Sequence, residues 1–371
     1  MKKVAVYAIT KDELQFVDKW MKSMWEADYI CILDTGSTDG TYEKLQEYQR
    51  NNPLKVFLSQ KTYNPWRFDT PRNDSMKLIP LDADFCICTD FDEVLIPGWA
   101  DILREAWDGT VNRLYYLYAW SHHKNGDPAR VFWYDKCHSN DGTWSWKYPV
   151  HESLVCTKEI RGKNISDKYI LLHHYPVAKA SRSNYLPLLE MRAKEYPDDY
   201  YGLVYLAHEY MYAGKPEECL KFTENLIAKI NLLDDDMNCV TDLYMFMGDS
   251  LKALGRYKEA EEYYKCGIIK DKTFRDNYIQ LAKLYMDQKR YDDAINVLHQ
   301  CLKDSRRQYS WLERDTTWSH ELWDLLCLAY YKIGAKHASL DCAELAYLKN
   351  PADDRLKYNV DIIKEELKVD K

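Results

Sequence analysis

Short apolar runs alternate with amphipathic segments in the first half of the chain. The stretches 4–9, 29–33, 55–58 and 85–88 are apolar and predict buried strands. Apolar residues at helical spacing predict a helix from Asp12 to Trp25, and a second helix is expected from Tyr42 to Arg50. Strands that alternate with helices favour an α/β fold in which helices cover a parallel sheet.

Aromatic strands follow this region. The segments 114–120 and 129–133 are predicted strands, and the residues between them, 122–128, form a hairpin-like turn. A last apolar strand, 170–172, ends at His173 and His174.

The second half of the chain has a different pattern, because strand signals stop near Ser181 and pairs of helices are expected instead. Small residues mark the first helix of each pair: Ala207, Gly248, Ala282 and Cys327. Twelve positions later each pair has a second small residue: Cys219, Ala260, Ala294 and Ser339. Three pairs also have a glycine at the seventh position after the marker: Gly214, Gly255 and Gly334.

This spacing resembles the tetratricopeptide repeat, a helix–turn–helix unit of about 34 residues. Gly248 and Ala282 are 34 residues apart, whereas the other marker spacings, 41 and 45, imply inserted loops near 234–236 and 306–318. Helical hairpins without repeat ancestry are the alternative. We therefore predict three parts: an α/β domain over 1–180, a linker helix over 181–198 and an all-α repeat solenoid over 199–371.

Composition narrows the class of protein. Of 371 residues, 46% are hydrophobic and 30% are charged, as in ordinary globular proteins. The net charge of −8 provides no basic field for nucleic acid, so a nucleic-acid partner is not expected. No apolar run reaches the length of a membrane span, and no signal peptide is recognised at Met1, so we expect a cytoplasmic protein with reduced cysteines.

The candidate chemistry begins at Asp90-Phe91-Asp92-Glu93, directly after the strand 85–88. Ligands bind at the carboxyl ends of strands in open α/β sheets. Paired carboxylates suit Mg²⁺ or Mn²⁺, whose coordination substrate phosphates complete. For an isolated motif of this kind, an acidic turn is the alternative.

Two further segments bear on this site. Asp34-Thr35-Gly36-Ser37-Thr38-Asp39-Gly40-Thr41 lies where a strand ends and a helix begins, and it is expected to allow close approach of an anion. Arg72 opens a predicted helix and is suited to a diphosphate, although a pair with a surface carboxylate would explain it equally well.

Taken in order, these motifs resemble family 2 glycosyltransferases of the GT-A fold, a Rossmann-like nucleotide-diphospho-sugar transferase fold. The resemblance implies an inverting, metal-dependent enzyme that uses a nucleotide-diphosphate sugar, with a UDP-sugar as the expected donor. It places Ile9, Glu13 and Asp34 at the nucleoside, Arg72 at the diphosphate, Asp90 at the ribose and Asp92 on the metal.

The resemblance also suggests acceptor-side residues. Glu152, in the aromatic segment 144–154, takes the place of the general base, with Asp127 and Asp135 as reserves. His173 and His174 fit a late histidine that completes the metal site, and the sequence does not decide between them or between Mn²⁺ and Mg²⁺.

The acceptor and the role of the repeats are less defined. The layout resembles bacterial enzymes that glycosylate peptides or proteins, including S-glycosyltransferases, and repeat arrays suit peptide recognition or homodimerisation. Trp120, Trp133, Trp144 and Trp146 could stack on sugars, which fits the alternative of a glycan- or lipooligosaccharide-extending enzyme. A catalytically inactive scaffold that works through its repeats is the other alternative.

Overall fold

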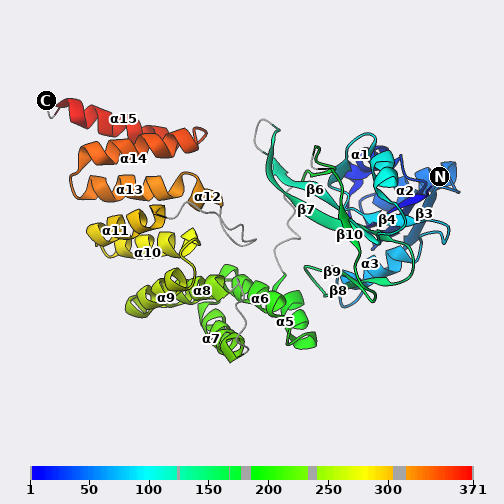
Figure 1. Ribbon diagram of the computed structural model, residues 1–371, viewed down its shortest axis with the longest axis horizontal. Coiled ribbons are helices and arrows are strands. Elements are labelled where there is room, and N and C mark those ends of the chain that lie inside the picture. The colour runs from blue at the N-terminus through cyan, green and yellow to red at the C-terminus, as the bar shows by residue number, and fades with distance from the viewer. Residues whose placement is uncertain are drawn as a thin grey trace. The chain divides into compact units, whose positions relative to one another are not determined.

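The computed structural model describes residues 2–122, 126–166, 168–176, 185–232, 240–303 and 315–369. The chain divides into two compact units, residues 1–192 and 193–371, which we call the sheet unit and the repeat unit (Figure 1). Helix α5, Leu186–Glu195, contains the division. The division falls within the segment 181–198, whose first four residues lie outside the described residues.

Among the described residues, the sheet unit contains a mixed sheet of nine strands in the order β3-β2-β1-β4-β7-β6-β11-β5, with β10 beside β6. The strands are β1 Val4–Thr10, β2 Tyr29–Asp34, β3 Val56–Gln60, β4 Phe85–Cys88, β5 Glu93–Leu95, β6 Arg113–His122, β7 Pro128–Ser139, β10 Gly162–Asn164 and β11 Leu172–His174. A separate pair consists of β8 Trp144–Lys147 and β9 Ser153–Cys156.

The predicted parallel pairing is correct for β3-β2-β1-β4, and β6 also pairs in parallel with β10 and β11. Strand β7 runs antiparallel to β4 and also pairs with β6, so the sheet is mixed. Long antiparallel strands next to β4 carry the aromatic segments that the sequence pattern identified. The central residues 123–125 of the predicted hairpin turn lie outside the described residues.

Four helices accompany the parallel strands: α1 Leu14–Met24, α2 Thr41–Asn51, α3 Asp69–Met76 and α4 Trp99–Ala106. Helix α3 begins three residues before the predicted start at Arg72. Alternate residues of β1 enter two cores, because successive strand side chains point to opposite faces. Val4, Val6 and Ala8 pack in the core that includes α1, whereas Ala5 and Tyr7 pack with Trp144 and Trp146.

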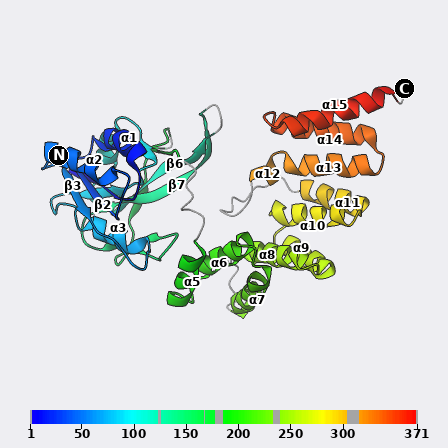
Figure 2. The same cartoon turned by 180° about the vertical axis from the view of Figure 1, so that it is seen from behind.

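The repeat unit consists of antiparallel helix pairs that stack in sequence, as both ribbon views show (Figure 2). Its helices are α6 Tyr200–Tyr212, α7 Pro216–Leu232, α8 Val240–Ala253, α9 Tyr257–Lys270, α10 Arg275–Asp287, α11 Tyr291–Leu302, α12 Asp315–Trp318, α13 Glu321–Lys332, α14 Lys336–Lys349 and α15 Asp354–Val369. Most of the two predicted inserted loops lies outside the described residues, at 233–239 and 304–314.

The small marker residues lie where the two helices of a pair touch. The Cys219 thiol donates to the Ala207 carbonyl at 3.2 Å, and the Ser339 hydroxyl donates to the Cys327 carbonyl at 2.8 Å. The turn after each marker helix requires a positive φ, which Gly214, Gly255 and Gly334 adopt at 67°, 76° and 82°. Lys289 adopts 60° at the same position of the third pair, so the repeat geometry persists without the glycine.

Candidate functional site

Strand order brings the predicted site residues to one edge of the sheet. Strands β1, β2 and β4 are parallel, and Thr10 is in register with Asp34. Their carboxyl ends therefore meet, and Asp90 and Asp92 follow directly after β4. Ile9, near the end of β1, is partly buried at this edge.

Asp34 is buried, and its carboxylate organises the turn that follows β2. It accepts hydrogen bonds from the backbone N–H groups of Gly36 and Ser37 and from the Gln60 amide, each at 2.9 Å. The Ser37 hydroxyl donates to its second oxygen at 2.5 Å. Asp34 thus shapes the turn, and in this structure its oxygens face protein donors.

The start of α1 is tied to the same turn. The Glu13 backbone N–H donates to the Thr41 hydroxyl at 2.8 Å, and Asp12 accepts from the Thr38 N–H at 2.7 Å. Gly36 has φ 104°, and a Cβ there would lie 2.8 Å from the Thr62 methyl group. Glycine is therefore needed for this loop to close against its neighbour.

Arg72 joins two of the predicted site carboxylates. Its Nε donates to Glu152 at 2.5 Å and its Nη2 donates to Asp90 at 2.8 Å, while Nη1 lies 3.2 Å from the Cys88 sulfur. The Arg72 side chain is only 5% exposed. We call Arg72, Asp90 and Glu152 the arginine bridge. Each guanidinium nitrogen faces a protein atom, which differs from the predicted contact with a diphosphate.

Lys136 of β7 lies on the other side of Asp90. Its ammonium is 4.0 Å from Asp90 Oδ2, and its side chain is 11% exposed. Burial by itself raises the pKa of Asp90, but the charges of Arg72 and Lys136 outweigh it and keep this pKa below its ordinary value. Lys136 was not among the residues predicted from sequence. The available signal was a lysine three residues after the aromatic segment 129–133.

Asp92 faces His174, and we call these two residues the candidate metal pair. Asp92 Oδ2 is 3.4 Å from His174 Nε2, because β5 and β11 are antiparallel with Glu93 opposite His174. His174 Nδ1 donates to the Trp120 carbonyl at 2.9 Å, which directs Nε2 toward Asp92. Burial lowers the pKa of His174, but its hydrogen bonds to Asp92 and Trp120 raise it above the ordinary value overall.

His173 points to the other face of β11. Its Nδ1 lies 3.0 Å from His122 Nε2, and the Tyr175 ring stacks on His122 at 4.7 Å. Burial and the nearby His122 lower the pKa of His173. The structure thus brings His174, rather than His173, to Asp92.

The donor set at this edge fits a divalent ion only in part. Across the described residues, no group of three or more histidine, cysteine, aspartate or glutamate side chains could hold a metal ion. The candidate metal pair supplies one carboxylate oxygen and one imidazole nitrogen. Such a pair fits an ion that substrate oxygens also coordinate, rather than an ion enclosed by protein.

Glu93 follows the two aspartates and is buried, with 1% of its surface exposed. Its Oε2 accepts the Asp90 backbone N–H at 2.9 Å. Burial and the Asp90 charge raise the pKa of Glu93 to about 7. Glu93 therefore holds the turn that carries Asp90 and Asp92.

The two reserve candidates for the base and the four tryptophans differ in their contacts and in their exposure to solvent. Asp135 pairs with Arg113 at 3.0 Å, and Asp127 is exposed. Trp144 and Trp146 are buried at 5% and 3%, where their indole N–H groups donate to Ser139 and Tyr7. Trp120 and Trp133 are 46% and 40% exposed. Of the four tryptophans, only these two present surface for stacking on a ligand.

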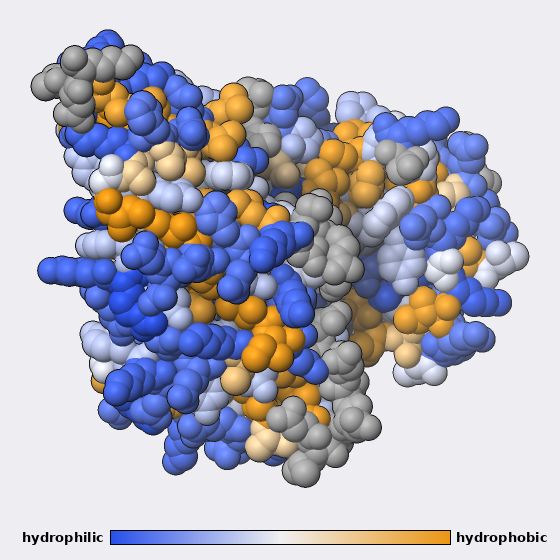
Figure 3. Space-filling view, turned by 60° about the vertical axis from the view of Figure 1, so that its left-hand side comes forward, coloured by the Kyte–Doolittle hydropathy of each residue, from blue (hydrophilic) through white to orange (hydrophobic). Residues whose placement is uncertain are grey.

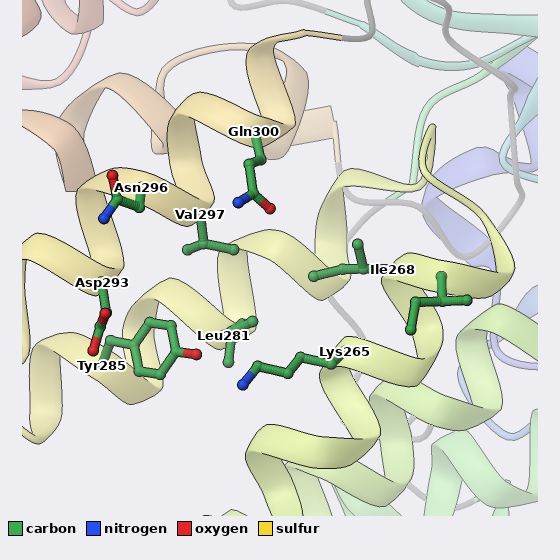
Figure 4. Close-up of a pocket in the computed structure, with 9 residues that line it drawn as sticks. Lys265, Ile268, Leu281, Tyr285, Asp293, Asn296, Val297 and Gln300 are labelled. Atoms are coloured by element: carbon green, nitrogen blue, oxygen red, sulfur yellow. The ribbon is translucent and has the colours of Figure 1, made fainter.

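The repeat unit has a pocket of about 360 Å³ between α9, α10 and α11. Its lining is aliphatic at Ile268, Leu281 and Val297, and the side chains of Asn296 and Gln300 project from α11 beside them (Figure 4). In the space-filling view, apolar surface occurs in patches separated by hydrophilic side chains (Figure 3). None of the helices described is long and apolar enough to cross a membrane.

Comparison with known proteins identifies the repeats. The tetratricopeptide repeat family matches residues 278–308, which begin in α10 and include α11. A thermophilic TPR protein of Thermus thermophilus is 20% identical over 48% of this chain and 88% of that chain, with a TM-score of 0.37. The C-terminal part of a TPR repeat-containing protein from Cytophaga hutchinsonii is 17% identical over 51% and 69%, with a TM-score of 0.40.

MamA from Desulfovibrio magneticus is 15% identical over 46% of this chain and 86% of that chain, with a TM-score of 0.37. A search of curated proteins finds no match. The repeat-family match and the helix pairs agree. The second half of this chain contains tetratricopeptide repeats, and the first half is a mixed-sheet unit.

Proposed function

We propose that the sheet unit is an inverting, metal-dependent glycosyltransferase with the GT-A fold, which moves a sugar from a UDP-sugar to a peptide or protein side chain. The observation that carries this proposal is the placement of the candidate metal pair beside the arginine bridge, at the carboxyl ends of the parallel strands. Asp90 and Asp92 both follow β4, but Asp90 faces Arg72 whereas Asp92 faces His174. This difference suits separate roles for the two carboxylates.

In this proposal, Asp92 and His174 would hold Mn²⁺ or Mg²⁺. The ion would neutralise charge on the departing nucleoside diphosphate. Ile9, Glu13 and the turn after Asp34 border the nucleoside, with Asp34 as its shaping residue. Asp90, whose side chain is 37% exposed, is the carboxylate placed to meet the ribose.

Glu152 is the proposed base. Its Oε1 accepts a hydrogen bond from Arg72 Nε at 2.5 Å, which holds the carboxylate in place beside Asp90. The acceptor O–H or S–H would attack the anomeric carbon and pass its proton to Glu152. The bond from that carbon to the diphosphate oxygen breaks, and its electron pair leaves with the diphosphate. The acceptor approaches opposite the leaving group, which inverts the anomeric centre.

The repeats support a peptide or protein acceptor, because tetratricopeptide repeats are protein-interaction elements. The exposed Trp120 and Trp133 favour a second candidate, a glycan acceptor, since tryptophan faces suit the apolar faces of sugar rings. Trp120 adjoins the candidate metal pair through its carbonyl. Transfer assays with peptide and oligosaccharide acceptors separate these two candidates.

The first experiment is thermal stabilisation by UDP and UDP-sugars with and without Mn²⁺, followed by donor hydrolysis. We expect Mn²⁺-dependent stabilisation that increases with ligand concentration. D92A should abolish this metal dependence, while E152A should retain UDP binding and lose transfer. D101N, which changes an 85% exposed carboxylate, is the matched control and should behave like the wild type.

Two results would contradict the proposal. If no nucleotide stabilises the folded wild-type protein, the inactive-scaffold alternative would replace it. If D92A and E152A both turn over donor at the wild-type rate, the residue assignments would be wrong.

A further inference from the structure

Two buried cations flank Asp90, but they differ in how they are used. Arg72 directs its nitrogens at Glu152, Asp90 and Cys88, at distances between 2.5 and 3.2 Å. A guanidinium held on three sides has little capacity for a further anion without breaking the arginine bridge. Breaking it would leave Asp90 and the largely buried Glu152 without their shared cation, which is costly.

Lys136 has a looser arrangement. Its ammonium lies 4.0 Å from Asp90, within ion-pair range but beyond hydrogen-bond length. The ring centres of Tyr134 and Trp146 lie 4.8 and 5.6 Å from Nζ. An ammonium has three N–H donors. Within the described residues, Lys136 therefore retains capacity for another acceptor.

Asp90 is more exposed than either cation that flanks it. The Asp90 side chain is 37% exposed, whereas those of Lys136 and Arg72 are 11% and 5% exposed. A ligand that reaches Asp90 therefore comes within a few ångströms of the Lys136 ammonium. Burial by itself lowers the pKa of Lys136, but Tyr134 and Asp90 raise it well above its ordinary value. The residue therefore remains charged at neutral pH.

We propose that Lys136 is the cation that binds a phosphate group of the ligand at this site, and that Arg72 is a positioning residue that holds Asp90 and Glu152. The inference rests on the proposed function, in which the ligand is a nucleoside diphosphate sugar. It transfers the predicted diphosphate contact from Arg72 to a lysine on the antiparallel strand β7. A compact ammonium with rotatable donors suits one phosphate oxygen.

The test compares UDP with uridine by calorimetric titration in the presence of Mn²⁺, using the full-length protein. K136M removes the charge and keeps the length of the side chain. Loss of a charge-assisted hydrogen bond should weaken UDP binding by about tenfold to a hundredfold. Uridine carries no phosphate, so its affinity should not change. K136R should recover a large part of the loss, and K158M, at a 62% exposed lysine, should bind both ligands as the wild type does.

Four outcomes overturn the proposal. Equal binding of UDP to K136M and the wild type removes Lys136 from the phosphate site while the proposed function stands. An equal loss of uridine and UDP affinity shows that the substitution damages the pocket rather than a phosphate contact. Failure of K136R to recover any UDP affinity excludes a role based on charge. A wild type that binds no uridine nucleotide removes the proposed function and this inference together.

K136Q provides a second test if K136M does not fold, because its polar side chain is better tolerated beside Asp90. A folded K136Q that binds UDP like the wild type also overturns the proposal. Inorganic pyrophosphate should compete with UDP on the wild type but not on a charge-free variant. Competition that is unchanged in K136Q would place the phosphate contact elsewhere.

Discussion

At the scale of single residues, the geometry of the site depends on which charged side chains form ion pairs. The planar guanidinium of Arg72 donates hydrogen bonds to both Glu152 and Asp90, which are 62 positions apart in the chain. The fork of donors in arginine matches this geometry, whereas a lysine at position 72 could not reach both carboxylates in the same way. The bridge therefore fixes the distance between the proposed base and the proposed ribose ligand.

Removing the guanidinium should destabilise the sheet unit. R72A leaves Asp90 and Glu152 without their shared cation, and we expect the free energy of unfolding to fall by about 3 kcal/mol or more. Urea titration followed by tryptophan fluorescence measures this change. K158A, which removes one partner of an exposed pair with Asp141, should change it by less than about 1 kcal/mol. Equal stability of the two variants would show that the bridge contributes nothing.

His138 predicts a pH dependence of stability. It is buried, and its Nε2 lies 2.8 Å from the Tyr7 hydroxyl oxygen. Burial lowers the pKa of His138 to about 4 in the folded protein, from 6.5. Between these two values the unfolded chain binds the proton and the folded chain does not, so stability falls as pH falls from 6.5 to 4.

This contribution amounts to roughly 3 kcal/mol over the whole window. Urea midpoints measured from pH 7 to pH 4 should show it, and H138Q should have a flatter profile than the wild type. H299Q, at an exposed histidine of α11, should keep the wild-type profile. An H138Q profile parallel to the wild type would contradict the assignment to His138.

At the scale of elements, strand alternation decides which of two adjacent histidines reaches the site. His174 faces Asp92, whereas His173 faces His122, because neighbouring side chains of β11 point to opposite faces. The pairing of β11 with β5 sets this register.

This geometry gives a paired test of the proposed metal site. In H174A, the affinity for Mn²⁺ in the presence of UDP should fall about tenfold or more. Even the loss of a residue that only hydrogen-bonds a metal ligand lowers metal affinity by that much. H173A should retain it. Calorimetric titration of UDP at several Mn²⁺ concentrations separates the two variants. An H173A protein that loses the metal dependence while H174A keeps it would reverse the assignment.

Close contact between helices constrains Gly248 in α8. A Cβ at this position would lie 2.3 Å from the ring of Tyr264, which is fully buried in α9. G248A should therefore lower the free energy of unfolding by about 1–3 kcal/mol through overpacking, although alanine is the better helix former. Urea titration followed by circular dichroism at 222 nm measures it.

The control is K258A, at an exposed position of α9, which should change stability by less than about 0.5 kcal/mol. A G248A protein as stable as K258A would mean that the Tyr264 ring has room to move. The small residue would then mark the repeat without being required by packing.

At the scale of the whole molecule, the two units have separate cores. One cluster of buried residues extends from Leu203 to Ile363, and two others lie within the sheet unit. Each unit therefore buries enough apolar surface to be a domain of its own.

We expect a fragment of residues 196–371 to fold without the sheet unit. It retains α6 to α15 and their continuous core. Circular dichroism should show a helical spectrum and a cooperative thermal transition. The fragment should not be stabilised by UDP with Mn²⁺, whereas the full-length protein should be. A fragment that is unfolded would show that the repeats depend on the sheet unit.

Local sequence patterns were sufficient to predict many of the strands and helices of this chain. Strands β1, β2 and β4 and helices α1 and α2 lie within one or two residues of the predicted segments, because strand and helix periodicities are local. The marker positions in the repeats likewise coincide with contacts between paired helices. The antiparallel pairing of β7 with β4 and of β11 with β5 was not predicted, since pairing between distant strands leaves no local pattern.

The sequence by itself determined the two kinds of architecture, the repeat spacing and the cluster of carboxylates after β4, because periodicity and strand ends are properties of neighbouring residues. Only the tertiary structure decided how the charged residues are used. It paired Arg72 with Glu152, placed Lys136 beside Asp90 and turned His174 rather than His173 toward Asp92. These contacts join residues far apart in the chain, and the sheet register that creates them comes from cooperative packing rather than from any short motif.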